Sequence, residues 1–133
     1  MADVVTIPSH LAVPQVRTYL TATAASDLLS PNPTAPTAID EHGRSAQTFV
    51  VEAVVCRGDT KRRAAVVGQD IYAVTAPLAV EAIDRILTGR TGATGVVSAG
   101  AAFDASDFLN TLSAHFTLHM LADTAAQPTI RAR

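Results

Sequence analysis

The feature that most constrains the fold is a long apolar run, AQTFVVEAVVCR, at residues 46–57. It is rich in β-branched residues, which favour strands. In a strand, alternate side chains point to opposite faces. One face would carry Phe49, Val51, Ala53 and Val55, and the other Thr48, Val50, Glu52, Val54 and Cys56. Neither face is properly polar, so the run predicts a strand covered on both sides.

The residues after this run predict its partner strand. Arg57-Gly58-Asp59-Thr60 has the composition of a turn, and residues 61–67 return with basic side chains near the tip, where water would solvate them. Gly68-Gln69-Asp70 predicts a bulge, after which residues 71–74 resume the strand. Residues 46–74 therefore predict one long hairpin.

Two helices are expected after the hairpin. Thr75 fits as an N-cap with Pro77 in the first turn, which predicts a helix over 76–88 that Gly89 closes. Its apolar stripe would be Leu78, Ala82, Ile83, Ile86 and Leu87, with Glu81, Asp84 and Arg85 facing away. Asp104, with Asp107 three residues on, predicts a cap for a helix over 105–119. Its buried stripe would be Phe108, Leu109, Leu112 and Phe116.

Together these elements predict a single α+β domain over residues 1–133. Its mixed or largely antiparallel sheet would centre on the hairpin, with the two helices packed on it. Elsewhere, residues 4–7 are β-prone, 16–20 alternate like a strand, 21–29 suit a helical turn or two, and 96–97 suit a short strand. Three prolines predict an irregular loop over 30–45, and the tail from Asp123 is expected to fray.

Composition narrows the function classes. The net charge is −2 and no face is evidently basic, which argues against nucleic acid as the main partner. The single cysteine, Cys56, excludes an internal disulfide, suits a reducing cytoplasm and is expected to be buried and inert. No apolar run approaches the roughly 20 residues of a membrane span, and residues 1–10 lack a signal-peptide pattern. We therefore expect a cytoplasmic protein without a membrane partner.

Five stretches carry a family resemblance: TIPSHL (6–11), VRTYL (16–20), GRSAQTFVVEAVV (43–55), GQDIYAVTAPLAVEAIDRIL (68–87) and GVVSAGAAFDASDFL (95–109). Together they resemble the C-terminal part of saccharopine dehydrogenase-like oxidoreductases over about residues 5 to 112. DIYAVTAP and FDASDFL are the most specific of these motifs. The resemblance implies a two-part enzyme, in which a Rossmann domain binds NAD(P) and a second α+β domain shapes the substrate pocket and often builds the dimer.

The Rossmann half is absent from this sequence. Gly89, Gly92 and Gly95 are the nearest approach to its glycine fingerprint, but they have the wrong spacing and follow a helix rather than a strand. We therefore expect a detached substrate-binding and dimerisation domain that binds no cofactor alone and transfers no hydride unaided. NAD(P) is implied for a missing partner domain. The expected partners are a small-molecule substrate and either a second copy, as a homodimer, or a Rossmann-domain protein, because an apolar patch left bare favours association.

Several residues are candidates for the site, and for each a structural role stands beside the functional one. His10 and Tyr72 are the candidate catalytic residues, as a general acid or base and as a hydroxyl that meets substrate. His10 also fits a loop histidine, and Tyr72 a core tyrosine. Arg44 suits a carboxylate clamp or an ion pair with Asp40 or Glu41. Arg17 and Tyr19 would line the same pocket, and Thr75 is a cap and secondarily a ligand donor.

Two further interpretations concern a metal site and the function. His115 and His119 would share a helix face, but tetrahedral zinc needs a third protein ligand and the sequence has no HExxH, so no metal site is expected. The alternative function is a free-standing small-ligand-binding protein, or a cofactor-free biosynthetic enzyme such as a cyclase or isomerase, that encloses an apolar ligand.

Overall fold

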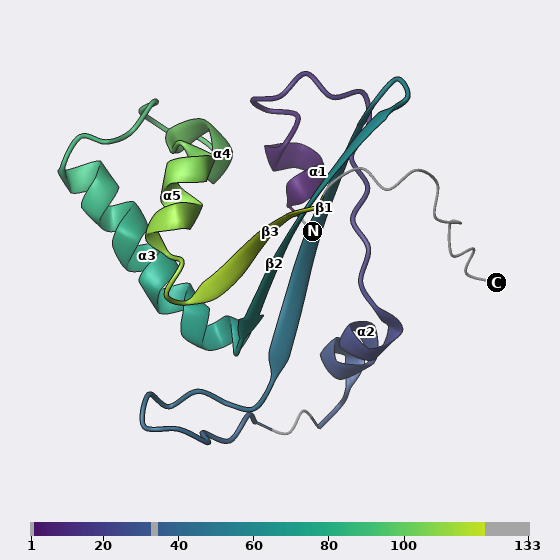
Figure 1. Ribbon diagram of the computed structural model, residues 1–133, viewed down its shortest axis with the longest axis vertical. Coiled ribbons are helices and arrows are strands. Elements are labelled where there is room, and N and C mark those ends of the chain that lie inside the picture. The colour runs from purple at the N-terminus through teal and green to yellow at the C-terminus, as the bar shows by residue number, and fades with distance from the viewer. Residues whose placement is uncertain (1, 33–34, 122–133) are drawn as a thin grey trace.

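The computed structural model describes residues 2–32 and 35–121 (Figure 1). Its elements in chain order are α1 (Asp3–Thr6), α2 (Ala22–Leu29), β1 (Thr48–Arg57), β2 (Thr60–Gln69), α3 (Ile71–Leu87), α4 (Ala99–Ala102), α5 (Ala105–Thr111) and β3 (Phe116–Leu121). The strands form one antiparallel sheet in the order β1-β2-β3. The α+β class with a sheet centred on the hairpin is therefore confirmed.

The hairpin is shorter than predicted and more regular. Its register is unbroken from the Thr48–Gln69 pair to the Arg57–Thr60 pair, and Gly58 in the two-residue turn has φ +56°. The predicted bulge at Gly68 is wrong. Gly68 is paired within the ladder, and the Phe49 ring crosses over it, so that an added Cβ would lie 2.7 Å from that ring. Glycine is needed here for space.

Helix α3 begins five residues earlier than predicted, at Ile71. Thr75 is not its N-cap. The cap is Asp70, which adopts the left-handed region at φ +52° and accepts hydrogen bonds from the first helical amides. This conformation turns the chain sharply out of β2, so residues 71–74 are helical rather than extended. Gly89, with φ +71°, follows the helix end as predicted.

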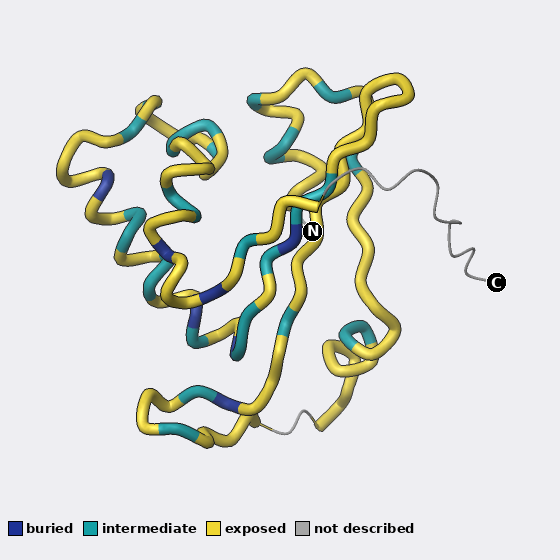
Figure 2. The backbone as a smooth tube through the Cα atoms, viewed as in Figure 1, coloured by how far each residue is buried: buried dark blue, intermediate teal, exposed yellow. Residues whose placement is uncertain are grey.

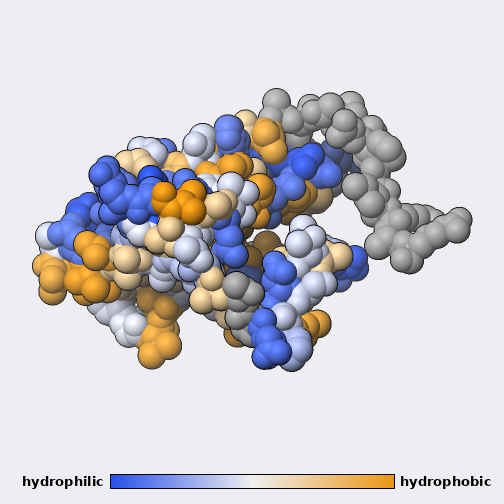
Figure 3. Space-filling model, turned by 90° about the horizontal axis from the view of Figure 1, so that it is seen from below, coloured by the Kyte–Doolittle hydropathy of each residue, from blue (hydrophilic) through white to orange (hydrophobic). Residues whose placement is uncertain are grey.

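The face that α3 buries matches the predicted one only in part. Leu78 packs against the core as predicted, whereas Ile83, Ile86 and Leu87 are exposed. Val74, Leu78, Glu81 and Arg85 face inward. Seven residues lie exposed within one stripe on the opposite side: Tyr72, Ala76, Ala79, Val80, Ile83, Ile86 and Leu87. We call these seven residues the outer stripe of α3. Apolar side chains gather at the left of Figure 3, the side on which α3 lies in Figure 1.

The predicted helix over 105–119 is also too long. Helix α5 ends at Thr111, and after a turn the chain forms β3, which pairs with β2 from Arg63–Leu121 to Gly68–Phe116. Asp104 caps α5 as predicted, accepting from the Asp107 amide. Because His115 lies in the turn and His119 in the strand, they do not share a helix face.

The core is small and sits where α3, α5 and β3 meet. Val74, Leu112 and Phe116 form its buried centre, with Phe49 and Val66 of the sheet packed against it. Strand β1 was predicted to be covered on both sides, and that is wrong. Every β1 residue except Phe49 is exposed, including Cys56, which was expected to be buried (Figure 2). The described chain has too few elements to cover this strand.

The N-terminal third adds little to the core. Residues 3–6 are helical rather than extended, whereas residues 16–20 and 96–97 form no strand. Helix α2 is confirmed, and the Thr21 hydroxyl caps it. The described parts of the 30–45 loop are irregular apart from one bridge between Ala38 and Ser45. The frayed tail predicted from Asp123 lies outside the described residues. None of the described helices has both the length and the apolarity to cross a lipid bilayer.

Candidate functional site

The Asp70 carboxylate is a buried polar group at the junction of β2 and α3. One oxygen, Oδ2, accepts the Ser45 amide at 2.7 Å, and the other, Oδ1, accepts the Tyr72 and Ala73 amides, each at 3.1 Å. Close by, the Gln69 side chain donates to the Ser45 carbonyl at 2.8 Å. Asp70 therefore joins the loop that precedes β1 to the first turn of α3.

These donors also control the ionisation of Asp70. Hydrogen bonds from the backbone amides hold the pKa of the Asp70 carboxyl below its ordinary value. The Ser45 amide has the largest effect and the Ala73 amide the next largest, while burial acts to raise the pKa. Asp70 is only 5% exposed, yet it stays charged because backbone donors surround it. The charge also lies at the positive end of the 17-residue α3.

Arg44 lies one residue before Ser45, at the edge of this junction. Its Nε donates to Asp40 Oδ2 at 2.7 Å, and its amide donates to Asp40 Oδ1 at 2.9 Å. The Arg44 amide is the main cause of the lowered pKa of Asp40. The ion pair with Asp40 is thus present, while within the described residues the two terminal guanidinium nitrogens donate no hydrogen bond. A carboxylate clamp by those nitrogens stays a prediction.

Tyr72 and Thr75 lie on the first turns of α3, three residues apart and so on neighbouring positions of its outer surface. Tyr72 is 68% exposed, which excludes the core role within this chain. The exposed Thr75 hydroxyl donates to the Ile71 carbonyl at 3.1 Å, so towards a further group it can act only as an acceptor. Asp70 fixes the start of the helix and thereby the position of both residues.

His10 belongs to a different part of the molecule. Its Nδ1 lies 2.9 Å from both the Thr6 carbonyl oxygen and the Ser98 hydroxyl oxygen. The ring also packs closely against Gly100, because a Cβ added to that glycine would lie only 2.5 Å from His10 Nε2. His10 is therefore half-buried and ties the end of α1 to the start of α4. Among the hydrogen bonds of the described residues, none joins His10 to Arg44 or Tyr72.

The other predicted pocket residues, Arg17 and Tyr19, lie exposed in the extended segment between α1 and α2. Tyr19 is one of the most exposed aromatic side chains of the chain. The structure thus places Arg44, Tyr72 and Thr75 around one junction, and it does not bring His10, Arg17 or Tyr19 into the hydrogen-bond network of that junction.

Sequence reasoning missed Arg85, the largest fully buried side chain. Its Nε bonds to Glu81 at 2.6 Å, its Nη1 pairs with Asp107 at 2.8 Å, and its Nη2 donates to Thr111 at 3.3 Å. The guanidinium also stacks 5.0 Å from the Phe108 ring centre. The Glu81 hydrogen bond, followed by Asp107, raises the pKa of Arg85. Because all its partners belong to α3 and α5, Arg85 clamps these two helices together and is not a free ligand group.

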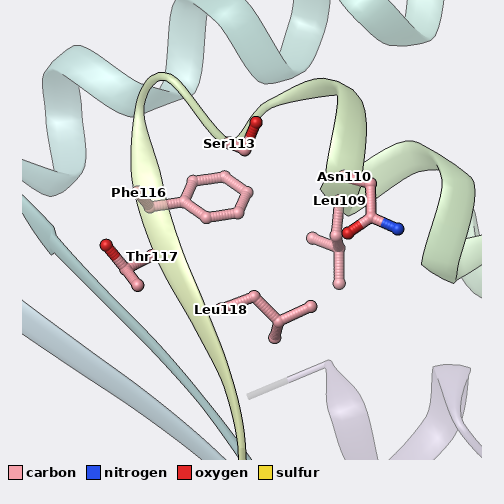
Figure 4. A pocket seen from close by; sticks show the side chains of 6 residues that line it. All are labelled: Leu109, Asn110, Ser113, Phe116, Thr117 and Leu118. Carbon is pink, nitrogen blue, oxygen red and sulfur yellow. The ribbon is translucent and has the colours of Figure 1, made fainter.

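A pocket of about 220 Å³ lies between the end of α5 and the start of β3 (Figure 4). Leu109, Asn110, Ser113, Phe116, Thr117 and Leu118 line it. It is smaller than the roughly 300–1,000 Å³ of typical small-molecule sites, so we assign no ligand to it. Within the described residues no cluster of three or more His, Cys, Asp or Glu side chains could hold a metal ion.

Comparison with known protein families, curated proteins and solved structures found no match to this chain. The resemblance to saccharopine dehydrogenase-like oxidoreductases therefore depends on the sequence motifs alone. Among these motifs, GQDIYAVTAP now has a local structure: it spans the end of β2, the Asp70 cap and the first turns of α3.

Proposed function

We propose that this chain is the substrate-binding and dimerisation half of a saccharopine dehydrogenase-like oxidoreductase, and that a separate nucleotide-binding domain covers its α3. The observation that carries the proposal is the outer stripe of α3. Its seven exposed residues include no charged side chain over about four turns of helix. A surface helix with nothing on its outer side is normally polar there, so this stripe fits a helix that docks against another domain.

The position of the polar candidates supports the same assignment. Tyr72 and Thr75 stand at the N-terminal end of the outer stripe, and Arg44 lies near the junction that starts the helix. A domain that covers the stripe would close over these residues. In this proposal Arg44 binds a carboxylate of a small polar substrate, the Tyr72 hydroxyl hydrogen-bonds the reacting group, and Thr75 supplies a further hydroxyl contact.

The nucleotide is assigned to the partner because the residues present do not fit it. Residues 89–95 lie in an irregular loop that follows α3, and the next helix begins only at Ala99. A dinucleotide fingerprint instead connects a strand directly to the N-terminus of a helix. We therefore derive no hydride-transfer step through this chain, whose own residues bind and orient the substrate.

The first test is calorimetric titration of the chain with NADH and NADPH. We expect no saturable binding at up to about millimolar nucleotide, which is the upper end of common enzyme affinities for substrates. Tight binding by the chain alone would contradict the division of roles between the two domains.

The second test adds a purified nucleotide-binding domain of a saccharopine dehydrogenase-like enzyme. We expect association that Ile83→Asp, in the outer stripe, abolishes, because it buries a charge at the interface. Leu28→Asp is the matched control. Leu28 is similarly exposed, at 70% against 55% for Ile83, but belongs to α2. Equal binding by both variants, or no binding by the wild-type chain, would refute the role given to α3.

A further inference from the structure

Within residues 2–32 and 35–121, the outer edge of β1 carries unpaired backbone groups. In the sheet order β1-β2-β3, β1 has a strand neighbour on one side only among these residues. The Asp70 amide bonds to the Gln47 carbonyl at 2.7 Å, which identifies 47 and 70 as a hydrogen-bonded pair. Since such pairs alternate along an antiparallel ladder, the odd-numbered β1 residues bond inward. The N–H and C=O groups of Val50, Glu52, Val54 and Cys56 then point outward from the sheet.

Nothing within the described residues protects this edge. Natural edge strands are usually short, bulged, covered, or guarded by lysine or proline. Strand β1 has ten residues and an unbroken register, and it contains no lysine or proline. Its one internal charge, Glu52, is paired with Arg63 of the neighbouring strand. None of the described backbone hydrogen bonds outside the regular elements joins another segment to residues 48–57.

Both faces of the same strand are apolar and exposed. Val50 and Val54 lie on one face at 67% and 47% exposure, and Val51 and Val55 lie on the other at 55% and 61%. A single helix or ligand would cover one face only. A further strand beside β1 would pair the edge and extend both faces at once, so the geometry favours a strand as the occupant.

The sequence of β1 makes a second copy of this chain a suitable strand. Two copies related by a two-fold axis perpendicular to the sheet pair antiparallel and keep each face continuous, so that even residues face even residues. Registers centred on Glu52 or Ala53 pair the most residues of Thr48–Arg57. A centre at Glu52 would set two carboxylates opposite each other, which is destabilising. A centre at Ala53 sets Glu52 opposite Val54 and Val51 opposite Val55.

We propose that β1 pairs with β1 of a second copy, antiparallel and centred on Ala53, so that two three-stranded sheets become one continuous sheet. Each strand contributes four outward residues, which gives about eight backbone hydrogen bonds across the axis, close to the number in an ordinary protein interface. The inference depends on the dimerisation half of the function proposed above and is independent of its oxidoreductase half.

Disulfide trapping tests the register. With Cys56→Ser as background, Ala53→Cys would place two thiols opposite each other at a non-hydrogen-bonded pair, with Cα atoms about 4.5 Å apart, inside the range for a disulfide. We expect mild oxidation to give a covalent dimer on non-reducing gels. Glu52→Cys and Val51→Cys in the same background should crosslink at least tenfold less, because their self-distances exceed about 7 Å. Crosslinking of Glu52→Cys equal to that of Ala53→Cys would overturn the register.

A charge pair at Val54 tests the interface without crosslinks. In the proposed dimer, Val54 of each copy lies opposite Glu52 of the other, so this contact occurs two times across the axis. Within one chain, Val54 lies opposite Arg63 of β2. Val54→Glu should therefore weaken the dimer roughly tenfold and leave the fold intact, and Val54→Lys should keep or strengthen the dimer. Sedimentation measures both, against a chain mass of 13.8 kDa. The opposite order would overturn the proposal.

Three further outcomes separate this inference from the function proposed above. A wild-type chain that stays monomeric at several hundred micromolar would refute the β1 pairing. A dimer that Ile83→Asp dissociates and Val54→Glu does not would place the second copy on α3 instead. Failure of the nucleotide-binding domain to associate would refute the oxidoreductase role and leave the β1 dimer standing.

Discussion

At the scale of single residues, Asp70 does more than any other side chain to define the junction of sheet and helix. It accepts three backbone amides, from Ser45, Tyr72 and Ala73, and it adopts a left-handed conformation that asparagine tolerates better than alanine does. Asp104, by comparison, accepts one amide at the start of α5. The two aspartates therefore allow a matched test of how much the junction depends on its cap.

We expect Asp70→Ala to destabilise the chain more than Asp104→Ala, for which loss of an N-cap costs about 1 kcal/mol. Asp70→Asn should lie between wild type and Asp70→Ala, because it keeps an acceptor and the backbone preference. Urea denaturation measures the free energy of unfolding of wild type and of the three variants. An Asp70→Ala variant no less stable than Asp104→Ala would contradict this role.

The lowered pKa of Asp70 gives the same test a pH dependence. A carboxyl whose pKa is lower in the folded state stabilises the fold when it is ionised in both states, above about pH 4. That contribution disappears as the pH falls through the folded-state pKa. The difference in stability between wild type and Asp70→Asn should therefore be constant near neutrality and shrink in acid. A difference that grows below pH 4 would contradict the assignment.

At the scale of elements, α3 and α5 are joined through Arg85. Its buried guanidinium bridges Glu81 of α3 and Asp107 of α5 and lies over Phe108. Arg90 offers a contrast, since it pairs with Asp84 at the surface with 47% of its side chain exposed. Arg85 thus joins two helices, whereas the acidic partners of Arg90 both belong to α3.

Arg85→Ala should destabilise the fold strongly and loosen α5, because it removes the buried cation that Glu81 and Asp107 share and opens a cavity; Glu81 keeps only the longer contact with Arg90, at 3.9 Å. Arg90→Ala should cost less than about 1 kcal/mol. Urea denaturation compares the two, and amide exchange shows whether Phe108 and its neighbours lose protection first. Similar losses for both variants would mean that Arg85 does not clamp the helices.

At the scale of the whole molecule, the described residues form a small core and leave two apolar surfaces exposed, the outer stripe of α3 and the edge of β1. A chain with this distribution gains stability from association, because binding to the folded state shifts unfolding by mass action. Its stability should therefore depend on its own concentration.

We expect the thermal midpoint, Tm, to rise by several degrees as the concentration increases. Above the dimer Kd most folded chains are paired, so each further rise in concentration adds to the free energy of unfolding by mass action. Val54→Glu should flatten this dependence, and Leu28→Asp, in α2 and part of neither surface, should not. Scanning calorimetry over a hundredfold range of concentration measures the shift. A wild-type Tm that is independent of concentration would exclude coupling between dimerisation and stability.

How much of the candidate site could be predicted differs from residue to residue. The ion pair of Arg44 with Asp40 follows from their spacing in one loop, and it was one of the two predicted roles. Arg85 gave no signal, because a charged residue on a helix is normally solvated, and only α5 packing across α3 buries it. Asp70 lies two residues after Gly68 and was assigned to the predicted bulge. Its helix-capping role depends on a left-handed backbone conformation that a single sequence does not reveal.

The sequence by itself determined the elements that depend on neighbouring residues: the Gly58 turn, the Asp104 cap and the glycine that follows α3. Local hydrogen bonds and backbone preferences decide such features within a few residues. The tertiary structure alone decided where residues remote in the chain meet. Phe116–Leu121 became a strand because β2 offered a free edge, and α3 turned Glu81 and Arg85 inward because α5 supplied Asp107. Those choices depend on partners that periodicity along one segment cannot identify.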